Sequence, residues 1–313
     1  MTFIIAEIGS NHGGDLSAAK RCIEKASFAR ASAAKFQLFS WKDLYGEMAE
    51  DKENKASIKV EWLPELKKTA DDCGIEFMCS AFSVNGLQQL EPFVARHKLA
   101  SPEKNHPHML QELKRQGKPV IASCGAACMR DIHFIINSLE GIDLTLLYCV
   151  SAYPTADVRL EKIVALKKAF PDTSIGLSDH SLDSTCAPVV AVTHFGATVI
   201  EKHFNPLGLT DTPDACVSLS FKQFMVMTSR IRRNPDAIPV YEPDDVEFTA
   251  RACYNRRIVA TREIKSGDFF GPDNIGIYRA ILPQAYYTNP MEYDDLIGKF
   301  ASRDYSIGAS IQD

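Results

Sequence analysis

Short apolar runs alternate with longer amphipathic segments along most of the chain. The first run covers residues 3–8, and residues 16–30 follow it with alanine and isoleucine at helical spacing. Eight strands are expected in this way, at 3–8, 33–39, 75–80, 98–101, 119–123, 144–150, 174–178 and 198–204. The helices that follow them are expected at 16–30, 61–72, 84–95, 107–116, 129–139, 160–170, 184–195 and 221–232.

Eight strand–helix repeats are typical of a (β/α)8 TIM barrel, and a doubly wound parallel sheet is the competing architecture. No G-x-G-x-x-G sequence follows the first strand, and together with the count of eight this favours the barrel. The pattern then breaks where Pro235, Pro239 and Pro243 stand among acidic residues. We therefore predict an α/β barrel domain at 1–234, a linker at 235–247, and a small β-rich domain at 248–313 with strands at 257–260 and 275–278.

The amino-acid composition makes some classes of binding partner improbable. The chain carries 35 basic and 40 acidic residues, a formal charge of -5, which argues against nucleic acid or an anionic membrane as the partner. A small anion is not excluded, because two or three lysines suffice to bind one. We expect neither a membrane span nor a signal peptide, since no apolar run is long enough and the first residues lack a basic stretch. Nine scattered cysteines without a CxxC pair indicate reduced thiols in a cytoplasmic protein.

Polar side chains gather where the predicted strands end. Because the carboxyl ends of barrel strands form the active site of such folds, we expect these side chains around one mouth. Ordinary turn polarity explains the serines, but lysines inside apolar strands are costly unless they meet an anion. The residues concerned are Glu7, Lys35, Gln37, Ser80, Lys98, Ser101, Glu103, Ser123, Ser151, Tyr153, Ser178, Asp179, His180, Glu201, Lys202 and His203.

Two lysines at this mouth, Lys35 and Lys98, stand among several serine hydroxyls, a combination that suits a phosphate or a carboxylate. The structural alternative is salt bridging to Glu7 or Glu103. Glu7 either orients a lysine or takes part in proton transfer.

His180 and His203 end two adjacent strands, which brings two imidazoles within reach of one divalent metal ion. A purely structural role for each histidine is the alternative. His12, on the first loop, is a ligand, a substrate contact or a turn residue. Cys79, Cys124 and Cys149 also lie at strand ends, where core packing is favoured over a nucleophilic role.

Several of these residues fall in segments with a recognisable order and spacing: 5–14 (IAEIGSNHGG), 35–37 (KFQ), 98–103 (KLASPE), 153–155 (YPT), 176–180 (GLSDH) and 201–204 (EKHF). Together they resemble the sialic acid synthase family, the phosphoenolpyruvate-condensing synthases of nonulosonic acids. The tail resembles the family's small antifreeze-like (SAF) domain through residues 268–274 and 296–299.

The resemblance implies a C–C bond-forming transferase. Phosphoenolpyruvate would condense with N-acetylmannosamine or a related N-acetylated amino sugar, and with water, to give a nonulosonic acid such as N-acetylneuraminate and phosphate. It also implies a divalent ion, Mn2+ or Mg2+, on His180 and His203. In the family an arginine of the small domain reaches the sugar of the partner subunit; Arg279 matches it, which implies a domain-swapped homodimer.

Carried over position by position, the resemblance assigns further roles. Glu103 would be a supporting acid, and Ser151 stands where sialate-forming members often have Asn. The anion-binding set would be Lys35, Lys98, Ser80, Ser101, Ser123 and Ser178, and the sugar-facing set Glu7, Gln37, Tyr153 and Asp214.

Three alternatives stay open. The sugar could be of pseudaminic or legionaminic type, because both Ser151 and Ala156 depart from the sialate-forming pattern. An aldol-type synthase using a phosphorylated sugar, as in keto-deoxy octulosonate synthesis, would need another cationic cluster. A non-enzymatic sugar-binding or scaffold protein would have lost the lysines or the histidines, and all are present.

Overall fold

The computed structural model describes residues 2–48, 54–233, 256–279 and 287–313. The chain divides into two compact units, Met1–Pro239 and Val240–Asp313. The predicted linker, 235–247, lies outside the described residues. Among the helices of these ranges, none has both the length and the apolar character that crossing a membrane requires.

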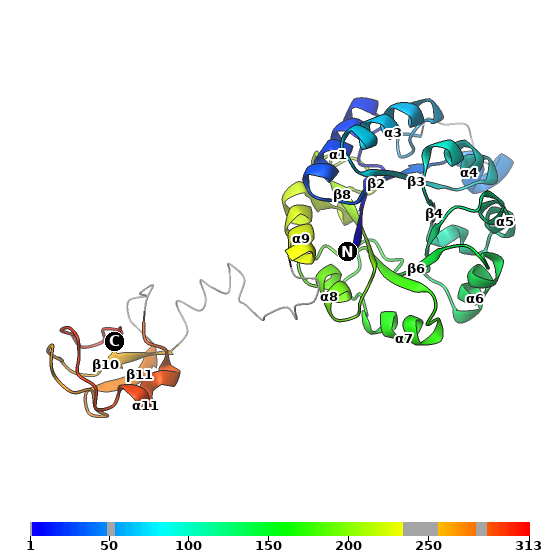
Figure 1. The fold of residues 1–313 in the computed structure, drawn as a ribbon. Coiled ribbons are helices and arrows are strands. Elements are labelled where there is room, and N and C mark those ends of the chain that lie inside the picture. The colour runs from blue at the N-terminus through cyan, green and yellow to red at the C-terminus, as the bar shows by residue number, and fades with distance from the viewer. Residues whose placement is uncertain (1, 49–53, 234–255, 280–286) are drawn as a thin grey trace. The chain divides into compact units, whose positions relative to one another are not determined.

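Parallel strands of the first unit close into a barrel, as Figure 1 shows. Each strand pairs with the next along the chain, and β1 also pairs with β8, with Glu7 opposite His203. Closure confirms the predicted (β/α)8 barrel, because a doubly wound sheet would leave two open edges. The strands are β1 (Phe3–Glu7), β2 (Ala33–Leu38), β3 (Glu76–Ala81), β4 (His97–Leu99), β5 (Val120–Ser123), β6 (Leu144–Cys149), β7 (Ser174–Asp179) and β8 (Val199–Asn205), with the short β9 (Leu219–Ser220) added to β8.

A ring of helices surrounds the strands. The first begins where Asp15 caps it, by accepting a hydrogen bond from the Ala18 N–H at 2.6 Å. The helices are α1 (Leu16–Phe28), α2 (Trp41–Tyr45), α3 (Leu63–Asp72), α4 (Val84–Leu90), α5 (Pro107–Gln116), α6 (Met129–Ser138), α7 (Glu161–Ala169), α8 (Ala187–Thr193) and α9 (Phe221–Arg233).

Several predicted elements are shorter than expected; the helix expected at 184–195, for example, covers only Ala187–Thr193. The helix expected at 84–95 ends at Leu90 and continues only as a 3-10 turn, Glu91–Phe93, because Pro92 cannot donate a helical hydrogen bond. The strand expected at 98–101 ends at Leu99, and Ser101 instead begins a second 3-10 turn, Ser101–Asn105.

Side chains alternate along each strand between the helices and the barrel interior. On β1, Ile4 and Ala6 join the core beneath the helices, whereas Ile5 faces inward. The inward residues of six strands form one apolar layer: Ile5, Ala33, Met78, Ile121, Leu147 and Val199. The same face of those strands turns polar or sulfur-bearing two residues later, toward the carboxyl ends: Glu7, Lys35, Ser80, Ser123, Cys149 and Glu201. We call these the apolar layer and the polar layer, and we count Lys98 of β4 with the polar layer because its Nζ contacts Ser123 and Glu201.

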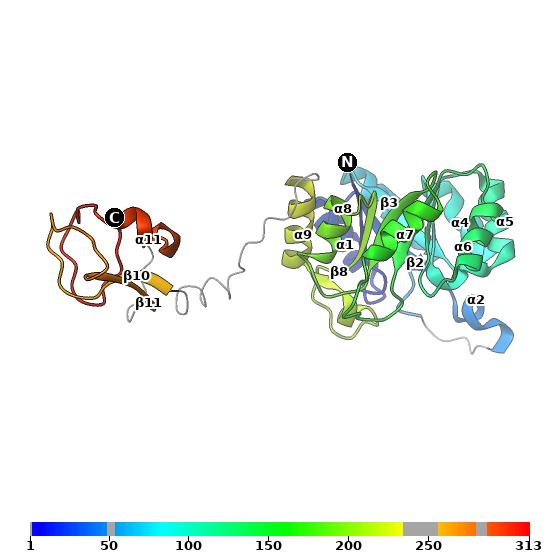
Figure 2. The ribbon, with the colours of Figure 1, turned by 90° about the horizontal axis from the view of Figure 1, so that it is seen from below.

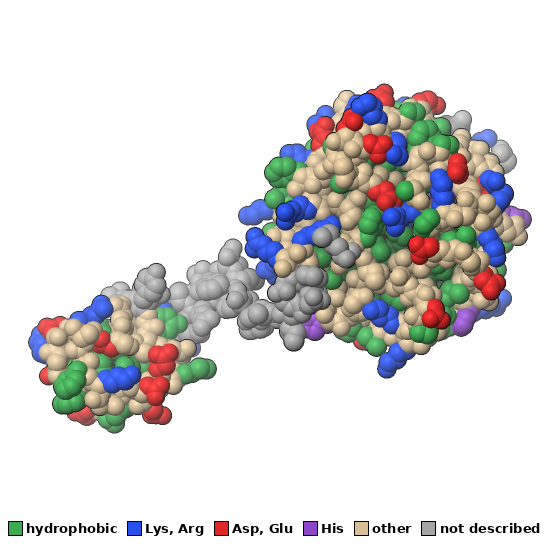
Figure 3. Space-filling model, viewed as in Figure 1, with side chains coloured by type: hydrophobic (Ala, Val, Ile, Leu, Met, Phe, Trp, Pro, Cys, Tyr) green, Lys and Arg blue, Asp and Glu red, His purple; other side chains and the backbone are tan. Residues whose placement is uncertain are grey.

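The barrel seen from the side has the N-terminus at one end and α2 at the other (Figure 2). The carboxyl ends of the strands therefore lie at the α2 end. On the face shown in Figure 3, acidic and basic side chains of the barrel are interspersed, in keeping with the nearly balanced composition.

The second unit is β-rich, as predicted. Its strands β10 (Arg256–Ala260) and β11 (Ile275–Arg279) pair antiparallel, with Arg256 opposite Arg279. A short helix, α11 (Tyr293–Leu296), follows. The unit has an apolar cluster of its own, made of Ile258, Ala260, Ile264, Phe270, Ile275, Leu296, Ala301, Tyr305 and Ile311.

Candidate active site

A cavity of about 240 Å3 opens above the polar layer, at the carboxyl ends of the strands. Its wall contains most of the residues that the sequence singles out. These are Glu7, Lys35, Gln37, Ser80, Lys98, Ser101, Ser123, Tyr153, Ser178, His180, His203 and Asp214; Phe82, Ala100, Pro102, Cys149 and Glu201 complete it.

Lys35 forms one side of the cavity with a carboxylate and a hydroxyl. Its Nζ lies 2.7 Å from Glu7 Oε2 and donates to Ser80 Oγ at 3.2 Å. Gln37, the next inward residue on β2, donates from Nε2 to Glu7 Oε1 at 2.8 Å. Glu7 is thus held from two sides by side chains of the neighbouring strand, as expected for a residue that orients a lysine.

Lys98 occupies the other side. Its Nζ donates to Ser123 Oγ at 2.8 Å and lies 3.7 Å from Glu201 Oε2. Glu201 Oε1 is also 3.9 Å from Lys35 Nζ and accepts a hydrogen bond from Ser178 Oγ at 3.3 Å. Glu201 therefore bridges the two lysines.

This buried group of two lysines and two carboxylates shifts the pKa of each member. Burial raises the pKa of Glu7 to about 7, although the Lys35 ammonium works against it. Burial would also raise the pKa of Glu201, but Lys35 and Lys98 outweigh it and hold that pKa below its usual value. Glu201 therefore carries the firm negative charge, and Glu7 titrates near neutral pH.

The pKa values of the two lysines shift in opposite directions. Burial lowers the pKa of Lys98, and the attraction of Glu201 only partly compensates. Burial also disfavours the charge of Lys35, but the carboxylates of Glu201 and Glu7 together raise its pKa.

His180 and His203 face the cavity from the ends of β7 and β8, with ring centroids 5.4 Å apart. The Nδ1–H of His180 donates to the Val150 carbonyl at 2.8 Å, which leaves Nε2 as the nitrogen with a free lone pair. Burial lowers the pKa of His180 to about 4 and also lowers that of His203, so both rings are neutral at neutral pH. The Tyr153 ring stacks on His180 at 4.1 Å between centroids.

The donor set fits a divalent metal ion with open coordination positions. Two neutral imidazoles reach the same cavity, and His203 Nδ1 is buried without a hydrogen-bond partner among the described residues. Within those residues no group of three or more His, Cys, Asp or Glu side chains could hold a metal. An ion held here would therefore take its other ligands from water and substrate.

The first loop positions Asp214. The backbone N–H and the Oγ of Ser10 both donate to Asp214 Oδ2 at 2.7 Å. Gly9 has a φ of +53°, and a Cβ there would collide with the Asp214 carboxylate and lie 3.3 Å from Gln37 Nε2. Only glycine allows Gln37 and Asp214 to lie against this turn.

His12 does not line the cavity. It is buried, its Nδ1 accepts from the Gly14 N–H at 3.1 Å, and its ring packs against Phe36 and Trp62. Of the three roles considered for it, the structure supports the turn residue.

Two predicted site residues of the barrel lie outside this cavity, and a third belongs to the second unit. Glu103 is half-buried in the 3-10 turn after β4, and burial raises its pKa. Ser151 is exposed beyond the end of β6, where the inward–outward alternation of the strand no longer applies. Arg279 lies at the end of β11 in the second unit.

Sequence patterns place Glu201 at the mouth without a specific role, and they favour core packing over a nucleophilic role for Cys149. Both lie two residues beyond members of the apolar layer, so strand periodicity was a usable signal. Lys202, the residue after Glu201, points away from the cavity. It is fully buried, and its Nζ lies 2.6 Å from Asp179 Oδ2 in an ion pair outside the cavity. Lys202 and Asp179 are therefore structural.

Comparison with known proteins gives a consistent result. The family model described as "NeuB family" matches residues 22–239. The chain is 32% identical over 336 residues to pseudaminic acid synthase of Campylobacter jejuni, covering 99% of this chain and 95% of that protein. It is 31% identical over 338 residues to N,N'-diacetyllegionaminic acid synthase of Legionella pneumophila, covering 99% and 93%.

A solved structure agrees with these sequence relatives. N-acetylneuraminic acid (sialic acid) synthetase from Leptospira borgpetersenii, in complex with citrate, superposes with a TM-score of 0.71 at 30% identity over 80% of this chain and 91% of that one. The predicted membership in the sialic acid synthase family is confirmed, and so is the prediction of a synthase-type enzyme. The chain belongs to the NeuB family.

Proposed function

We propose that the protein condenses phosphoenolpyruvate with an N-acetylated amino sugar and water, giving a nonulosonic acid and phosphate. The observation that carries the proposal is the placement of two buried ammonium groups, on Lys35 and Lys98, among hydroxyls in one cavity. A substrate with one phosphate and one carboxylate matches two separated cations with Ser80, Ser101, Ser123 and Ser178 as further donors.

The overall reaction makes one C–C bond and one C–O bond, to the oxygen of water, and breaks the C–O bond to phosphate. Carbon 3 of phosphoenolpyruvate attacks the aldehyde carbon of the open-chain sugar, and the aldehyde oxygen takes up a proton. Water adds to carbon 2 and loses a proton, and the C–O bond to phosphate then breaks. Glu7, whose pKa is near neutral, can hold or release a proton at this stage, and its carboxyl faces the cavity from β1.

His180 and His203 would hold Mn2+ or Mg2+, which would supply Lewis acidity toward the aldehyde oxygen. The chain's own contribution is to keep both imidazoles neutral, and to orient His180 through the Val150 carbonyl. Gln37, Tyr153 and Asp214 complete the wall on the sugar side.

The identity of the amino sugar stays a proposal. N-acetylmannosamine is the reference substrate, and precursors of pseudaminic or legionaminic acid are the alternatives, which the names of the relatives above support. A phosphorylated sugar is disfavoured, because Lys35 and Lys98 are the only lysines or arginines among the described residues of the cavity wall.

We also propose a role for the second unit. It would act as an antifreeze-like domain in a swapped homodimer, with Arg279 reaching the sugar bound by the partner subunit, and the enzyme would work in the cytoplasm. If so, mixing Arg279→Ala with a Lys98→Met variant restores activity through mixed dimers that have one intact site. Failure of every such mixture to regain activity would remove the cross-subunit role.

Phosphate release is the direct test of the function. The enzyme is incubated with phosphoenolpyruvate, Mn2+ and a panel of N-acetylated amino sugars, among them N-acetylmannosamine and precursors of pseudaminic and legionaminic acids. We expect release that requires both a sugar and the metal. No release with any sugar would refute the proposed function, and undiminished turnover after EDTA treatment would refute the metal role alone.

A further inference from the structure

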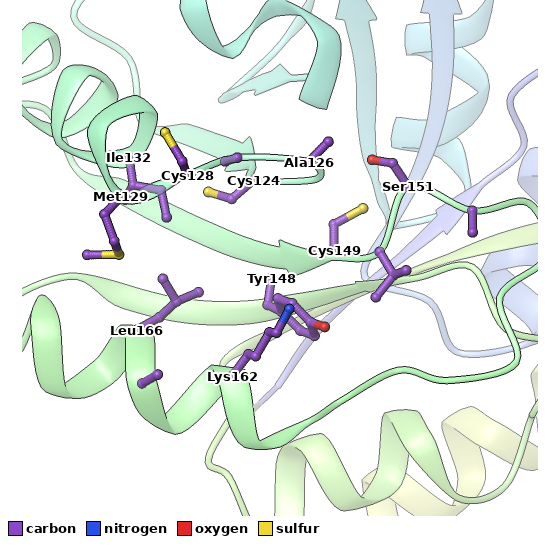
Figure 4. Close-up of a pocket in the computed structure, with 14 residues that line it drawn as sticks. Cys124, Ala126, Cys128, Met129, Ile132, Tyr148, Cys149, Ser151, Lys162 and Leu166 are labelled. Carbon is purple, nitrogen blue, oxygen red and sulfur yellow. The ribbon is translucent and has the colours of Figure 1, made fainter.

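A second cavity, of about 560 Å3, lies between α6 and α7, beside the polar layer. Figure 4 shows its walls: Cys128, Met129 and Ile132 come from α6 and the residue before it, Lys162 and Leu166 from α7, and β6 supplies Tyr148 and Cys149. Its volume falls in the usual range for sites that hold a small organic molecule, roughly 300–1,000 Å3. Of its lining residues only Cys149 also lines the active-site cavity, so the two cavities are neighbours with largely different walls.

The second cavity holds an unused hydrogen-bond donor. Tyr148 is 6% exposed, and its hydroxyl is buried without a partner among the described residues. Leaving a buried hydroxyl unpaired costs free energy, which a ligand that accepts a hydrogen bond would recover. Tyr148 lines the cavity, and Figure 4 draws its hydroxyl beside the Lys162 side chain.

Lys162 adds a positive charge at the same place. Its Nζ lies 6.0 Å from the centre of the Tyr148 ring, on the exposed side of α7. A hydroxyl donor and an ammonium group that lines the same cavity are complementary to a carboxylate, with Arg159 acting in the same sense and the nearby Glu161 and Asp157 acting against it. The group that this corner of the cavity recognises is therefore an anionic acceptor.

The rest of the lining is apolar and rich in sulfur. Cys124, Cys128 and Cys149 contribute thiols and Met129 a thioether, next to the aliphatic Ile132 and Leu166. Sulfur atoms make favourable contacts with the edges of aromatic rings, beyond the general gain from burying apolar surface. This lining therefore favours a ligand whose main part is apolar, and an aromatic ring would make the best contacts with it.

The loop over the second cavity is strained and tied to the active site. Ala126 has a φ of +52°, a left-handed conformation that is unfavourable for a residue with a Cβ. Next to it, the Gly125 N–H donates to Ser101 Oγ at 3.0 Å, and Ser101 belongs to the active-site cavity. Strained backbone of this kind clusters at ligand-binding segments.

We propose that the cavity between α6 and α7 is a second binding site, for a small aromatic monocarboxylate whose ring lies among the sulfur-bearing side chains and whose carboxylate meets Tyr148 and Lys162. The site is distinct from the substrate cavity and does not depend on the reaction proposed above.

Thiol protection tests this site in the intact enzyme. The probe is 4-phenylbutyrate, and the readout is the rate at which iodoacetamide alkylates each cysteine, resolved by mass spectrometry of peptides. Cys128 is exposed and lines the second cavity, whereas Cys186 and Cys216 are exposed and do not, so they serve as internal references. We expect saturable protection of Cys128, at least threefold, with unchanged rates at the two references.

Variants locate the bound probe. Ala165→Trp, on the exposed side of α7, fills the cavity and should abolish protection. Lys162→Met should raise the half-saturating concentration by about threefold, as for a partly solvated ion pair. Tyr148→Phe should raise it by about tenfold, because it removes a hydrogen bond to a charged group. Lys168→Met, which changes an exposed lysine of the same helix outside the cavity, should have no effect.

Three results would overturn the proposal. One is a Cys128 rate that does not respond to 4-phenylbutyrate up to the limit of its solubility. Another is protection that persists in Ala165→Trp, which would place the probe elsewhere. The third is protection that disappears in Lys98→Met, which would show that the probe occupies the substrate cavity instead.

Discussion

Two successive layers inside the barrel are built from the same strands, yet they serve different purposes. The apolar layer, which includes Leu147, is buried and has no ionisable group. The polar layer, two residues further along, buries Glu7, Lys35 and Glu201 almost as completely. Burying charges of this kind is costly, and replacing a whole buried ion pair by apolar side chains of similar volume is often neutral or stabilising. The difference teaches that the polar layer is retained for chemistry, while the apolar layer provides stability.

Replacing one lysine of the polar layer should have the largest effect. Lys98→Met removes the ammonium group at Ser123 and Glu201, and we expect kcat/KM for phosphoenolpyruvate to fall by about a thousandfold, since a developing charge loses a preorganised partner. Phosphate release measures this change. Because Glu201 loses one of its two ammonium partners, stability should fall as well, so activity is compared per folded molecule. A variant that keeps wild-type kcat/KM would contradict the separation of roles.

A cavity in the apolar layer should do the opposite. Leu147→Ala leaves a hole at a fully buried site and should reduce the free energy of unfolding by about 2–5 kcal/mol. Urea denaturation measures the loss. Activity per folded molecule, at a temperature where the variant is folded, should change much less than in Lys98→Met. Comparable losses of activity in both variants would erase the distinction between the layers.

The pH dependence of stability distinguishes the layers further. Burial raises the pKa of Glu7 to about 7, above its ordinary value of 4.5, so between these pH values the folded state binds a proton that the unfolded state has released. This group therefore makes the protein less stable as pH rises through that window, with a slope of at most about 1.4 kcal/mol per pH unit. Glu7→Gln should remove this contribution, measured as the difference between the slopes of wild type and variant in urea denaturation from pH 5 to 8. The buried histidines, whose pKa values are lowered, contribute with the opposite sign in both proteins. An identical slope in wild type and variant would show that Glu7 is not its source.

The smallest effect is expected at a single hydroxyl. Ser123→Ala deletes the acceptor of the hydrogen bond from Lys98 and one donor for the bound anion. We expect about a fivefold rise in KM for phosphoenolpyruvate, near 1 kcal/mol, with little change in stability. Steady-state kinetics measure it. A loss as large as that of Lys98→Met would mean that the hydroxyl, rather than the charge, governs binding.

Much of the fold and the site could be predicted from the sequence because strand periodicity and barrel geometry are strong constraints. Alternation along a strand, combined with the position of barrel active sites, was enough to bring Lys35, Lys98, His180 and His203 to one mouth. The same alternation would have placed Glu201 inward and Lys202 outward, but their adjacent charges obscured the difference.

Other features depend on tertiary structure that a sequence pattern does not encode. Ser151 follows the end of β6, where period two no longer determines direction, and it lines the cavity between α6 and α7 instead. The cavity between α6 and α7 depends on how far two helices stand apart, and the loop at Ala126 adopts a conformation that its residue type disfavours. No periodicity in the sequence marks either feature.

The binding of phosphoenolpyruvate to matched lysine variants tests the central claim most directly. Titration calorimetry compares the wild type with two variants, Lys98→Met in the polar layer and Lys118→Met. Lys118 lies just before β5 begins, at the opposite end of the barrel, and its Nζ donates to the Val94 carbonyl. The account predicts that Lys118→Met binds phosphoenolpyruvate as the wild type does, and that Lys98→Met binds it at least a hundredfold more weakly. Equal affinity in Lys98→Met and the wild type would show that the polar layer is not where this substrate binds.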